Sequence, residues 1–134
     1  MLNKKISMHK IIINTPNAPA PIGPYNQAVL INNMLYASGQ IAINPATGNV
    51  ENDNIEAETH LVMKNIRAIL EAANMGFEHI VKTTIFLSDM SLFLNVNEVY
   101  GNYFTTDYPA RETVAVKGLP KNVHVEISVT ACMH

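Results

Sequence analysis

The amino-acid sequence predicts an α+β fold in which two helices pack on one face of a single mixed β-sheet. Two stretches have apolar residues at helical spacing, whereas the segments before, between and after them have the composition and alternation of strands. The expected order is strands, helix, strand, helix, strands. A chain of 134 residues is expected to form one domain, residues 1–134, with a core that needs no disulfide or structural metal.

The N-terminal part is predicted to contain three short strands and one stiff loop. A β-branched run over 9–14 indicates the first strand, and residues 1–8 are expected to be a flexible extension. Four prolines between residues 15 and 24 remove so many backbone donors that this segment must be an extended loop. Strands over 27–32 and 34–38 meet at two asparagines, which indicates a tight hairpin.

The first helix is expected to run for about five turns between Asp53 and Gly76. Asp53, with Glu56 three residues later, is an N-terminal signal, and Gly76 fits a C-terminal stop. Apolar side chains recur between them at helical spacing and are expected to form one buried face: Val62, Ile66, Ile69 and Ala73.

A strand over 80–87 and a helix beginning near Asp89 or Ser91 follow. The strand alternates, so one set of its side chains is expected to share a face: Val81, Thr83, Ile85 and Leu87. The helix carries an aromatic stripe, which is more typical of a core than of a ligand site.

The last two strands, over 113–117 and 122–131, are predicted to pair as a hairpin. Arg111 lies just before the first strand, and alternation places Glu126 on the polar face of the second. Taken alone, each of these side chains is more typical of an ordinary surface group than of a site. The residues by themselves therefore predict a soluble α+β domain without an assigned activity.

Composition argues against several classes of protein. The formal charge of −2 gives no positive field that would gather nucleic acid, and no apolar stretch is long enough to span a membrane. The lone Cys132 and the lack of a signal-peptide pattern favour a cytoplasmic protein. An apolar fraction of 48% with only 15% charged residues suggests that other subunits cover part of the surface.

Metal and covalent chemistry have no good candidates in the sequence. The five histidines do not have the paired spacing of zinc ligands, and the scattered glycines form neither a phosphate nor a dinucleotide loop. No serine has the flanking glycines of a nucleophile elbow, and Cys132 lies in the terminal segment. We expect no metal site.

Several short motifs, in order, resemble the Rid/YjgF family of reactive intermediate deaminases, whose members are also named endoribonuclease L-PSP or translation inhibitor proteins. The resemblance extends over about residues 9–131. The motifs that carry it are Ile-Gly-Pro-Tyr-Asn-Gln over 22–27, Ser-Gly-Gln-Ile over 38–41, Pro-Ala-Arg over 109–111, Leu-Pro at 119–120 and Val-Glu-Ile over 125–127. Their co-occurrence is far more specific than any one motif.

The resemblance implies a chorismate-mutase-like α+β fold and a homotrimer with a central barrel and sites in clefts between subunits. It also implies hydrolysis of enamines and imines such as 2-aminoacrylate to 2-keto acids and ammonia, as in a 2-iminobutanoate/2-iminopropanoate deaminase. The implied partners are small imine or enamine carboxylates, and no cofactor is implied.

Residue by residue, the resemblance assigns catalytic roles to Arg111, Glu126 and Tyr25. Arg111 matches the arginine that holds the substrate carboxylate, for which a planar two-pronged donor is apt. Glu126 matches the glutamate that positions or activates the attacking water. Tyr25 matches a tyrosine that lines the pocket, here presented by the proline-rich loop.

Five further positions match substrate-binding positions of the family. Ser38 and Gly39 match the segment whose backbone faces the ligand, although Gly39 taken alone favours a β-bulge over a close approach to a ligand. Phe93 and Asn97 match pocket-side helix positions. Thr113 stands where many members have a cysteine, and threonine can hydrogen-bond a ligand or water but is a weak nucleophile.

Glu112 places a negative charge next to Arg111 in sequence. Because side chains alternate along a strand, we expect the two to diverge rather than pair. Three functions remain open: an imine deaminase, an endoribonuclease or translation inhibitor, and a noncatalytic trimer that binds small carboxylates.

Overall fold

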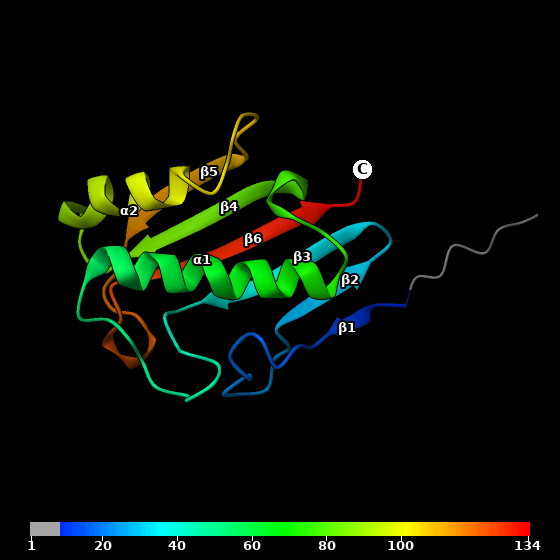
Figure 1. Ribbon diagram of the computed structural model, residues 1–134, viewed down its shortest axis with the longest axis horizontal. Coiled ribbons are helices and arrows are strands. Elements are labelled where there is room, and N and C mark those ends of the chain that lie inside the picture. The colour runs from blue at the N-terminus through cyan, green and yellow to red at the C-terminus, as the bar shows by residue number, and fades with distance from the viewer. Residues whose placement is uncertain (1–8) are drawn as a thin grey trace, which may run out of the picture.

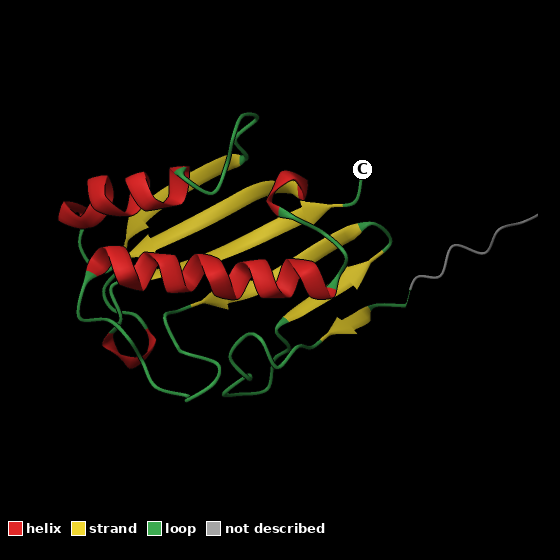
Figure 2. Cartoon of the chain, viewed as in Figure 1, coloured by secondary structure: helices red, strands yellow, loops and turns green. Residues whose placement is uncertain are grey.

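The computed structural model describes residues 9–134, and within them one six-stranded sheet carries two α-helices on one face (Figures 1 and 2). The predicted α+β fold with both helices on one face is confirmed. The extension expected over residues 1–8 lies outside the described residues. The elements are β1 (Ile11–Ile13), β2 (Ala28–Ile31), β3 (Met34–Gln40), α1 (Ile55–Ala72), β4 (Ile80–Leu87), α2 (Phe93–Gly101), β5 (Ala110–Ala115) and β6 (Val125–Cys132).

The sheet is mixed, with the strand order β1-β2-β3-β6-β4-β5. Strands β4 and β5 pair in parallel, and the other neighbours are antiparallel. The predicted hairpin between the last two strands is therefore wrong, because β4 lies between β5 and β6. Helix α2 forms the crossover that a parallel pair requires, and residues 116–124 then carry the chain to the far side of β4.

The core lies between the helices and the sheet. The predicted apolar stripe of α1 is confirmed, since Val62, Ile66, Ile69 and Ala73 are all buried. Burying a Val or Ile side chain stabilises the fold by about 1.5–3 kcal/mol. Most of the buried apolar side chains belong to one cluster between the helices and the sheet. Within residues 9–134, no helix has the length and apolar character needed to cross a membrane.

The ends of α1 differ from the predicted ones. Asn54, rather than Asp53, is the N-cap, and its side chain accepts a hydrogen bond from the Ala57 amide at 2.9 Å. At the other end Asn74, with φ of 58°, adopts the left-handed conformation that was expected of Gly76. Asparagine tolerates this conformation better than most residues, so the Asn directly after the last stripe residue, Ala73, was a usable stop signal.

The expected hairpin between β2 and β3 is present, with Asn32 in the left-handed region. Two register shifts, one in β3 and one in β4, then determine which side chains share a face. Strand β3 shifts register against β6 between Ala37 and Gln40, which confirms the bulge predicted at Gly39. Strand β4 also shifts near its start, so Ile80 is buried and Val81 is exposed, contrary to the predicted alternation.

One buried carboxylate connects α1 to the start of β6. The Glu58 side chain is fully buried, and its Oε2 accepts hydrogen bonds from the backbone amides of His124 at 2.7 Å and Val125 at 3.1 Å. Its Oε1 lies 2.7 Å from the His124 Nδ1. Glu58 therefore fixes the strand start just before Glu126.

We predict that Glu58→Ala lowers the free energy of unfolding by about 2–4 kcal/mol, because it leaves two buried amides and a histidine without an acceptor. Glu58→Gln should be intermediate, since an amide retains one acceptor oxygen. Urea denaturation at one fixed protein concentration and pH measures both. The control is Glu71→Ala on the exposed side of the same helix, for which we expect a change within about 0.5 kcal/mol. Equal losses for Glu58→Ala and Glu71→Ala would contradict the role of this network.

Candidate active site

The predicted site residues lie in two separate groups, one on each face of the sheet. The first group surrounds Glu126 on the face away from the helices, and the second surrounds Arg111 beside α2. We call them the glutamate half-site (Tyr25, Ser38, Gly39, Pro120 and Glu126) and the arginine half-site (Phe93, Asn97, Tyr100, Arg111 and Thr113).

Alternation along β6 explains the position of Glu126. Val125 and Ile127 face the helices and are fully buried, so the side chain between them points to the opposite face. Glu126 is about half-buried, and this burial raises the pKa of its carboxyl group. Among residues 9–134 no hydrogen bond or ion pair holds this carboxylate. The Glu126 carboxylate therefore accepts a proton more readily than a free carboxylate does.

Gly39 provides the space that Glu126 occupies. A Cβ atom at position 39 would lie 2.6 Å from the Glu126 Oε2 and 2.7 Å from its carboxyl carbon. A real Cβ atom essentially never lies this close to another heavy atom, so only glycine leaves the carboxylate in this place. Gly39 therefore has both of the roles that the sequence left open, a bulge residue and a position of close approach.

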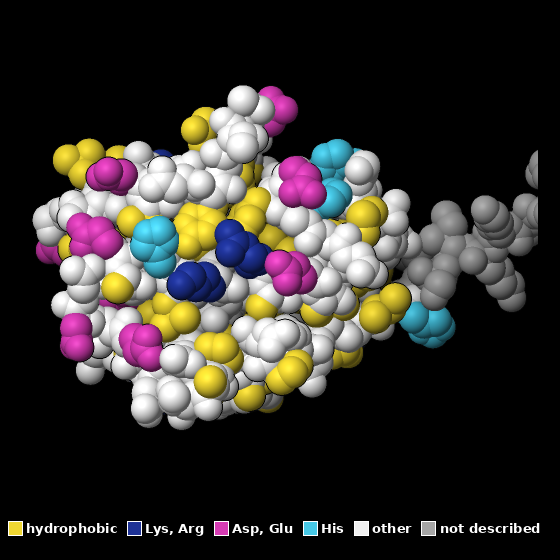
Figure 3. Space-filling model, viewed as in Figure 1, with side chains coloured by type: hydrophobic (Ala, Val, Ile, Leu, Met, Phe, Trp, Pro, Cys, Tyr) yellow, Lys and Arg dark blue, Asp and Glu magenta, His cyan; other side chains and the backbone are white. Residues whose placement is uncertain are grey.

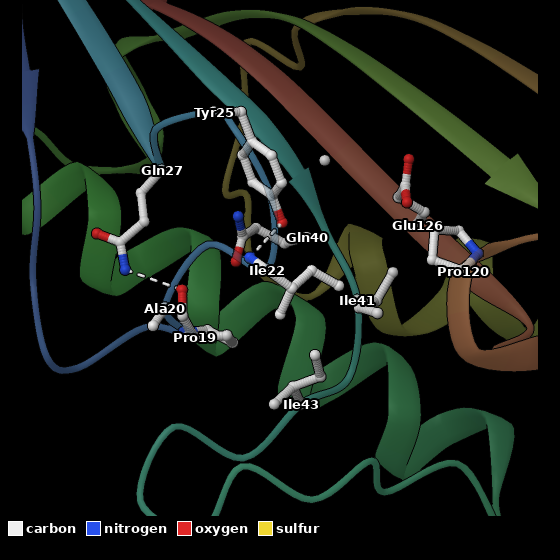
Figure 4. Close-up of a pocket in the computed structure, with 11 residues that line it drawn as sticks. Pro19, Ala20, Ile22, Tyr25, Gln27, Gln40, Ile41, Ile43, Pro120 and Glu126 are labelled. Carbon is white, nitrogen blue, oxygen red and sulfur yellow. Dashed lines mark hydrogen bonds between the residues drawn. The ribbon is translucent and has the colours of Figure 1, made fainter.

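The proline-rich loop places Tyr25 at the mouth of the glutamate half-site (Figure 4). Gln27 holds this loop from beneath, since its Nε2 donates to the carbonyls of Thr15, Ala18 and Pro19 and its Oε1 accepts from the Thr15 amide at 2.7 Å. The stiffness predicted from the prolines is therefore reinforced by one buried amide side chain.

Ser38 lines the same hollow, but its hydroxyl has a partner. The Oγ donates to the Asn26 carbonyl at 2.6 Å, and the Ser38 amide donates to the Gln27 carbonyl at 2.9 Å. Ser38 thus ties the loop to β3. Pro120 closes the opposite side of the hollow. Pro120 belongs to the Leu-Pro motif, but the sequence analysis did not predict that it lines the site.

Arg111 is held in a frame of one amide and two aromatic rings. Its Nη1 donates to the Asn97 Oδ1 at 2.6 Å, and its guanidinium carbon lies 5.7 Å from the centre of the Phe93 ring and 5.2 Å from that of Tyr100. Stacking of this kind orients a guanidinium without neutralising it. No carboxylate among residues 9–134 pairs with Arg111, so its charge is available to an anion.

Tyr100 is a site residue that sequence reasoning missed, because it was assigned to the core stripe of α2. Its hydroxyl lies 2.9 Å from the Thr83 Oγ1, and burial raises the pKa of this phenol. The available signal was spacing: Tyr100 follows Asn97 by three residues and so lies on the same side of the helix. Tyr108 and Pro109 complete the hollow beside Arg111.

The two residues after Arg111 point in opposite directions. Glu112 accepts a hydrogen bond from the Thr84 hydroxyl and lies 3.1 Å from the Lys82 Nζ on the open face, so the expected divergence from Arg111 is confirmed. Thr113 returns to the helix side, and its Oγ1 is a buried polar atom without a hydrogen-bond partner in the described part of the chain.

Within one chain the two half-sites do not meet. Arg111 is in register with Thr83 of β4, whereas Glu126 is in register with Phe86, and the two side chains leave the sheet on opposite faces. The structure thus groups the eight predicted site residues into two sets of four. The sheet thus separates a cation and a carboxylate, neither of which has a partner of opposite charge among residues 9–134.

Known proteins are similar to this chain over nearly its whole length. The model of the family described as endoribonuclease L-PSP matches residues 15–133. A Lactococcus lactis protein named as a regulator, AldR, is 50% identical over 120 residues, which cover 90% of this chain and 95% of that protein. The human protein named 2-iminobutanoate/2-iminopropanoate deaminase is 41% identical over 125 residues, covering 93% of this chain and 91% of that one.

Solved structures agree with the sequence comparisons. The crystal structure of Escherichia coli TdcF with bound serine superposes with a TM-score of 0.89 at 38% identity, covering 92% of this chain and 99% of that one. The family match over nearly the whole chain, the identities above 30% and the shared fold lead to one conclusion: this chain belongs to the endoribonuclease L-PSP family, also called the Rid/YjgF family.

Proposed function

We propose that this chain is a deaminase that hydrolyses imines and enamines of small carboxylates, in sites that form between two copies of the chain. The observation that carries the proposal is the pair of half-sites: an unpaired guanidinium in an aromatic frame and an unpaired carboxylate with a raised pKa, on opposite faces of one sheet. A second copy that brings its glutamate half-site to the arginine half-site of the first would complete the site. The human relative named as an imine deaminase and the TdcF structure with serine support this choice of substrate.

In the proposed site Arg111 binds the substrate carboxylate. Asn97, Phe93 and Tyr100 fix the direction of its fork, so both donors can meet both oxygens of the ligand. Thr113 lies on the same face, and its buried Oγ1 has no hydrogen-bond partner in the described part of the chain. A rotation of this side chain toward the hollow would supply a further hydrogen bond to the ligand or to water. In the proposed assembly, the carbon of the C=N bond would lie next to the glutamate half-site of the other copy.

The reaction needs water and acid–base chemistry only. An enamine such as 2-aminoacrylate first gains a proton on its terminal carbon and becomes the iminium, the protonated imine. A water oxygen then bonds to the C=N carbon while Glu126 takes one water proton and the C=N π electrons move to nitrogen, which gives a carbinolamine. Glu126 returns that proton to the nitrogen, and the C–N bond breaks as the hydroxyl oxygen forms C=O and releases its own proton, the equivalent of the one gained in the first step. One imine and one water give one 2-keto acid and one ammonia. Burial raises the pKa of the Glu126 carboxyl group, which makes it a stronger proton acceptor than a free carboxylate and suits a group that must take up and return a proton.

The expected homotrimer with a central barrel fits the surface of the sheet. The open face carries exposed apolar side chains, among them Tyr36 at 50% and Val114 at 44% exposure, which another copy would cover. A closed ring of three copies would place each arginine half-site against the glutamate half-site of its neighbour. The assembly needs no cofactor, and a cytoplasmic location remains a prediction.

The endoribonuclease alternative takes its support from the description of the family model. The formal charge of −2 weighs against it, and the face shown in Figure 3 has its few basic side chains among acidic ones rather than in a stripe. The relative named as a regulator favours a noncatalytic carboxylate sensor. Carboxylate binding and turnover, both measured for Glu126→Gln, separate this sensor from the enzyme. The substitution should change neither quantity in a sensor, whereas the enzyme should lose turnover.

The role of Arg111 predicts a large loss of activity in Arg111→Ala. Removing the partner of a desolvated carboxylate costs about 2 kcal/mol or more, which is at least about 30-fold in kcat/KM. The measurement is keto-acid release from 2-aminoacrylate generated by a coupled dehydratase. Arg67→Ala is a matched control, because Arg67 also lies over two aromatic rings, those of Phe77 and Tyr103, but on α1 outside the site. No acceleration by the wild-type protein would refute the proposed function.

A site shared between copies predicts complementation. Arg111→Ala and Glu126→Gln should each be inactive alone, whereas the two variants unfolded together and refolded as an equal mixture should recover about a quarter of the wild-type activity. About one site in four then receives Arg111 from one variant and Glu126 from the other. Absence of recovery in mixed oligomers verified by native mass spectrometry would show that both residues act from one chain.

The Gly39 contact predicts that Gly39→Ala displaces the Glu126 carboxylate. A displacement of about 1 Å in a catalytic group costs about 100-fold in rate, so we expect a loss of that order in kcat. Gly118→Ala is the control, since no atom lies within 4 Å of the position its Cβ would take. Full activity of Gly39→Ala in the coupled assay would contradict this account of the site.

A further inference from the structure

We infer that His124 is a positioning residue for the proposed reaction: through its bond to the buried Glu58, its ring holds the entry to β6 so that the Glu126 carboxylate stays in the glutamate half-site. This role rests on the proposed function, because Glu126 is the residue that would handle the water. His124 lines neither half-site hollow, so it would act only through the backbone that leads to Glu126. We call Glu58 and His124 the positioning pair.

The positioning pair is built around a buried carboxylate. The Glu58 side chain is 0% exposed, whereas that of His124 is 43% exposed. The Glu58 Oε2 accepts hydrogen bonds from two backbone amides, and an ionised carboxylate can only accept, so we assign the proton in the third contact to the His124 Nδ1. This ring donor fixes the plane of the carboxylate and keeps Oε2 in line with both amides.

The backbone at His124 is held from two sides. Its amide donates to Glu58 on α1 at 2.7 Å, and its carbonyl accepts from the Ser88 amide, just after β4, at 2.9 Å. Glu126 follows two residues later and is in register with Phe86 of β4. A shift of the backbone at His124 is therefore carried to Glu126, because only Val125 separates the two residues.

The chain directly before His124 needs such an anchor. Lys121 and Asn122 both have φ of 55°, in the left-handed region that residues other than glycine occupy only when their surroundings hold them there. Pro120, which precedes them, lines the glutamate half-site beside Glu126 (Figure 4). The positioning pair secures the chain immediately after this strained segment, so it holds one wall of the half-site as well as the carboxylate.

A histidine that only stabilises the fold would have a different signature. Its substitution would lower the free energy of unfolding but leave kcat per folded site unchanged. A positioning residue lowers kcat and leaves KM nearly unchanged, because Arg111, which would hold the substrate carboxylate, lies on β5 and does not contact the positioning pair.

The test compares His124→Asn with His124→Asp in the coupled dehydratase assay, with folded fraction and oligomer size checked for each variant. The two new side chains have the same shape, but asparagine can place a donor near the position of Nδ1, whereas aspartate places a second acceptor against Glu58. We expect kcat of His124→Asn within about 2-fold of the wild type and kcat of His124→Asp at least about 10-fold lower, with KM changed by no more than about 2-fold in either.

A second substitution should rescue the defective variant. With Glu58→Gln added to His124→Asp, the glutamine Oε1 can still accept from the two backbone amides while its Nε2 donates to the new carboxylate. We expect kcat to recover to within about 3-fold of the wild type. The control is His134→Asp, because the Nδ1 of His134 also has one contact, 2.7 Å from the Cys132 carbonyl oxygen, but lies beyond the other end of β6. This control should keep the wild-type kcat.

Equal kcat values for His124→Asn and His124→Asp, or no recovery in the double variant, would overturn the role of His124. A carbon-13 NMR titration of the Glu126 carboxyl group tests this role without any turnover. Burial raises the pKa of this group, so a carboxylate displaced toward water in His124→Ala should have a lower pKa than in the wild type and in His124→Asn. The same pKa in all three proteins would also overturn the role of His124, whereas a wild type that accelerates no imine hydrolysis would refute the proposed function alone.

Discussion

The structure depends on one constraint, the alternation of side chains across a sheet that is covered by helices on one face only. Residues that follow the apolar period of β6 build the core, and those between them are directed away from it. The same rule along β5 sends Arg111 and Thr113 to the helix side and Glu112 to the open side. The position of every charged group near the site follows from the strand register.

Stability and the proposed chemistry use different charged groups. Glu58 is buried with all its partners present, and it holds the start of β6 in place. Glu126 and Arg111 have no partner of opposite charge among residues 9–134, which costs stability in a single chain and leaves both groups available to a ligand. Glu58 binds the backbone amides of the two residues that immediately precede Glu126, so a fully satisfied carboxylate on α1 positions an unsatisfied one on β6.

Local patterns in the sequence predicted the elements, the helix face and the polar face of β6, because these follow from the periods of helices and strands. The hairpin between the last two strands was wrong because strand pairing depends on the path of the connection, here a crossover through α2 that only the tertiary fold defines. The bulge at the start of β4 reversed Ile80 and Val81 for a similar reason, since a one-residue shift is set by the partner strand.

The site was predictable to a different degree. The residue types in the motifs allowed catalytic roles to be assigned to Arg111, Glu126 and Tyr25 from a resemblance, and these roles stay predictions. The contact between Gly39 and Glu126 was beyond sequence reasoning, because it joins residues 87 positions apart through a bulge whose geometry is tertiary. Tyr100 was missed because one ring serves both the core and the guanidinium of Arg111, and periodicity identifies only the first role.

The raised pKa of Glu126 links the proposed assembly to the chemistry. In the single chain burial favours the protonated carboxyl, whereas a guanidinium arriving from another copy favours the ionised form. A bound substrate carboxylate offsets much of that positive charge, and the affinity of Glu126 for a proton rises again. Binding of substrate to Arg111 would therefore make Glu126 a stronger base at the point when a water molecule must be activated. In the proposed assembly the ligand, rather than a permanent ion pair, would connect the cation of one copy to the carboxylate of another.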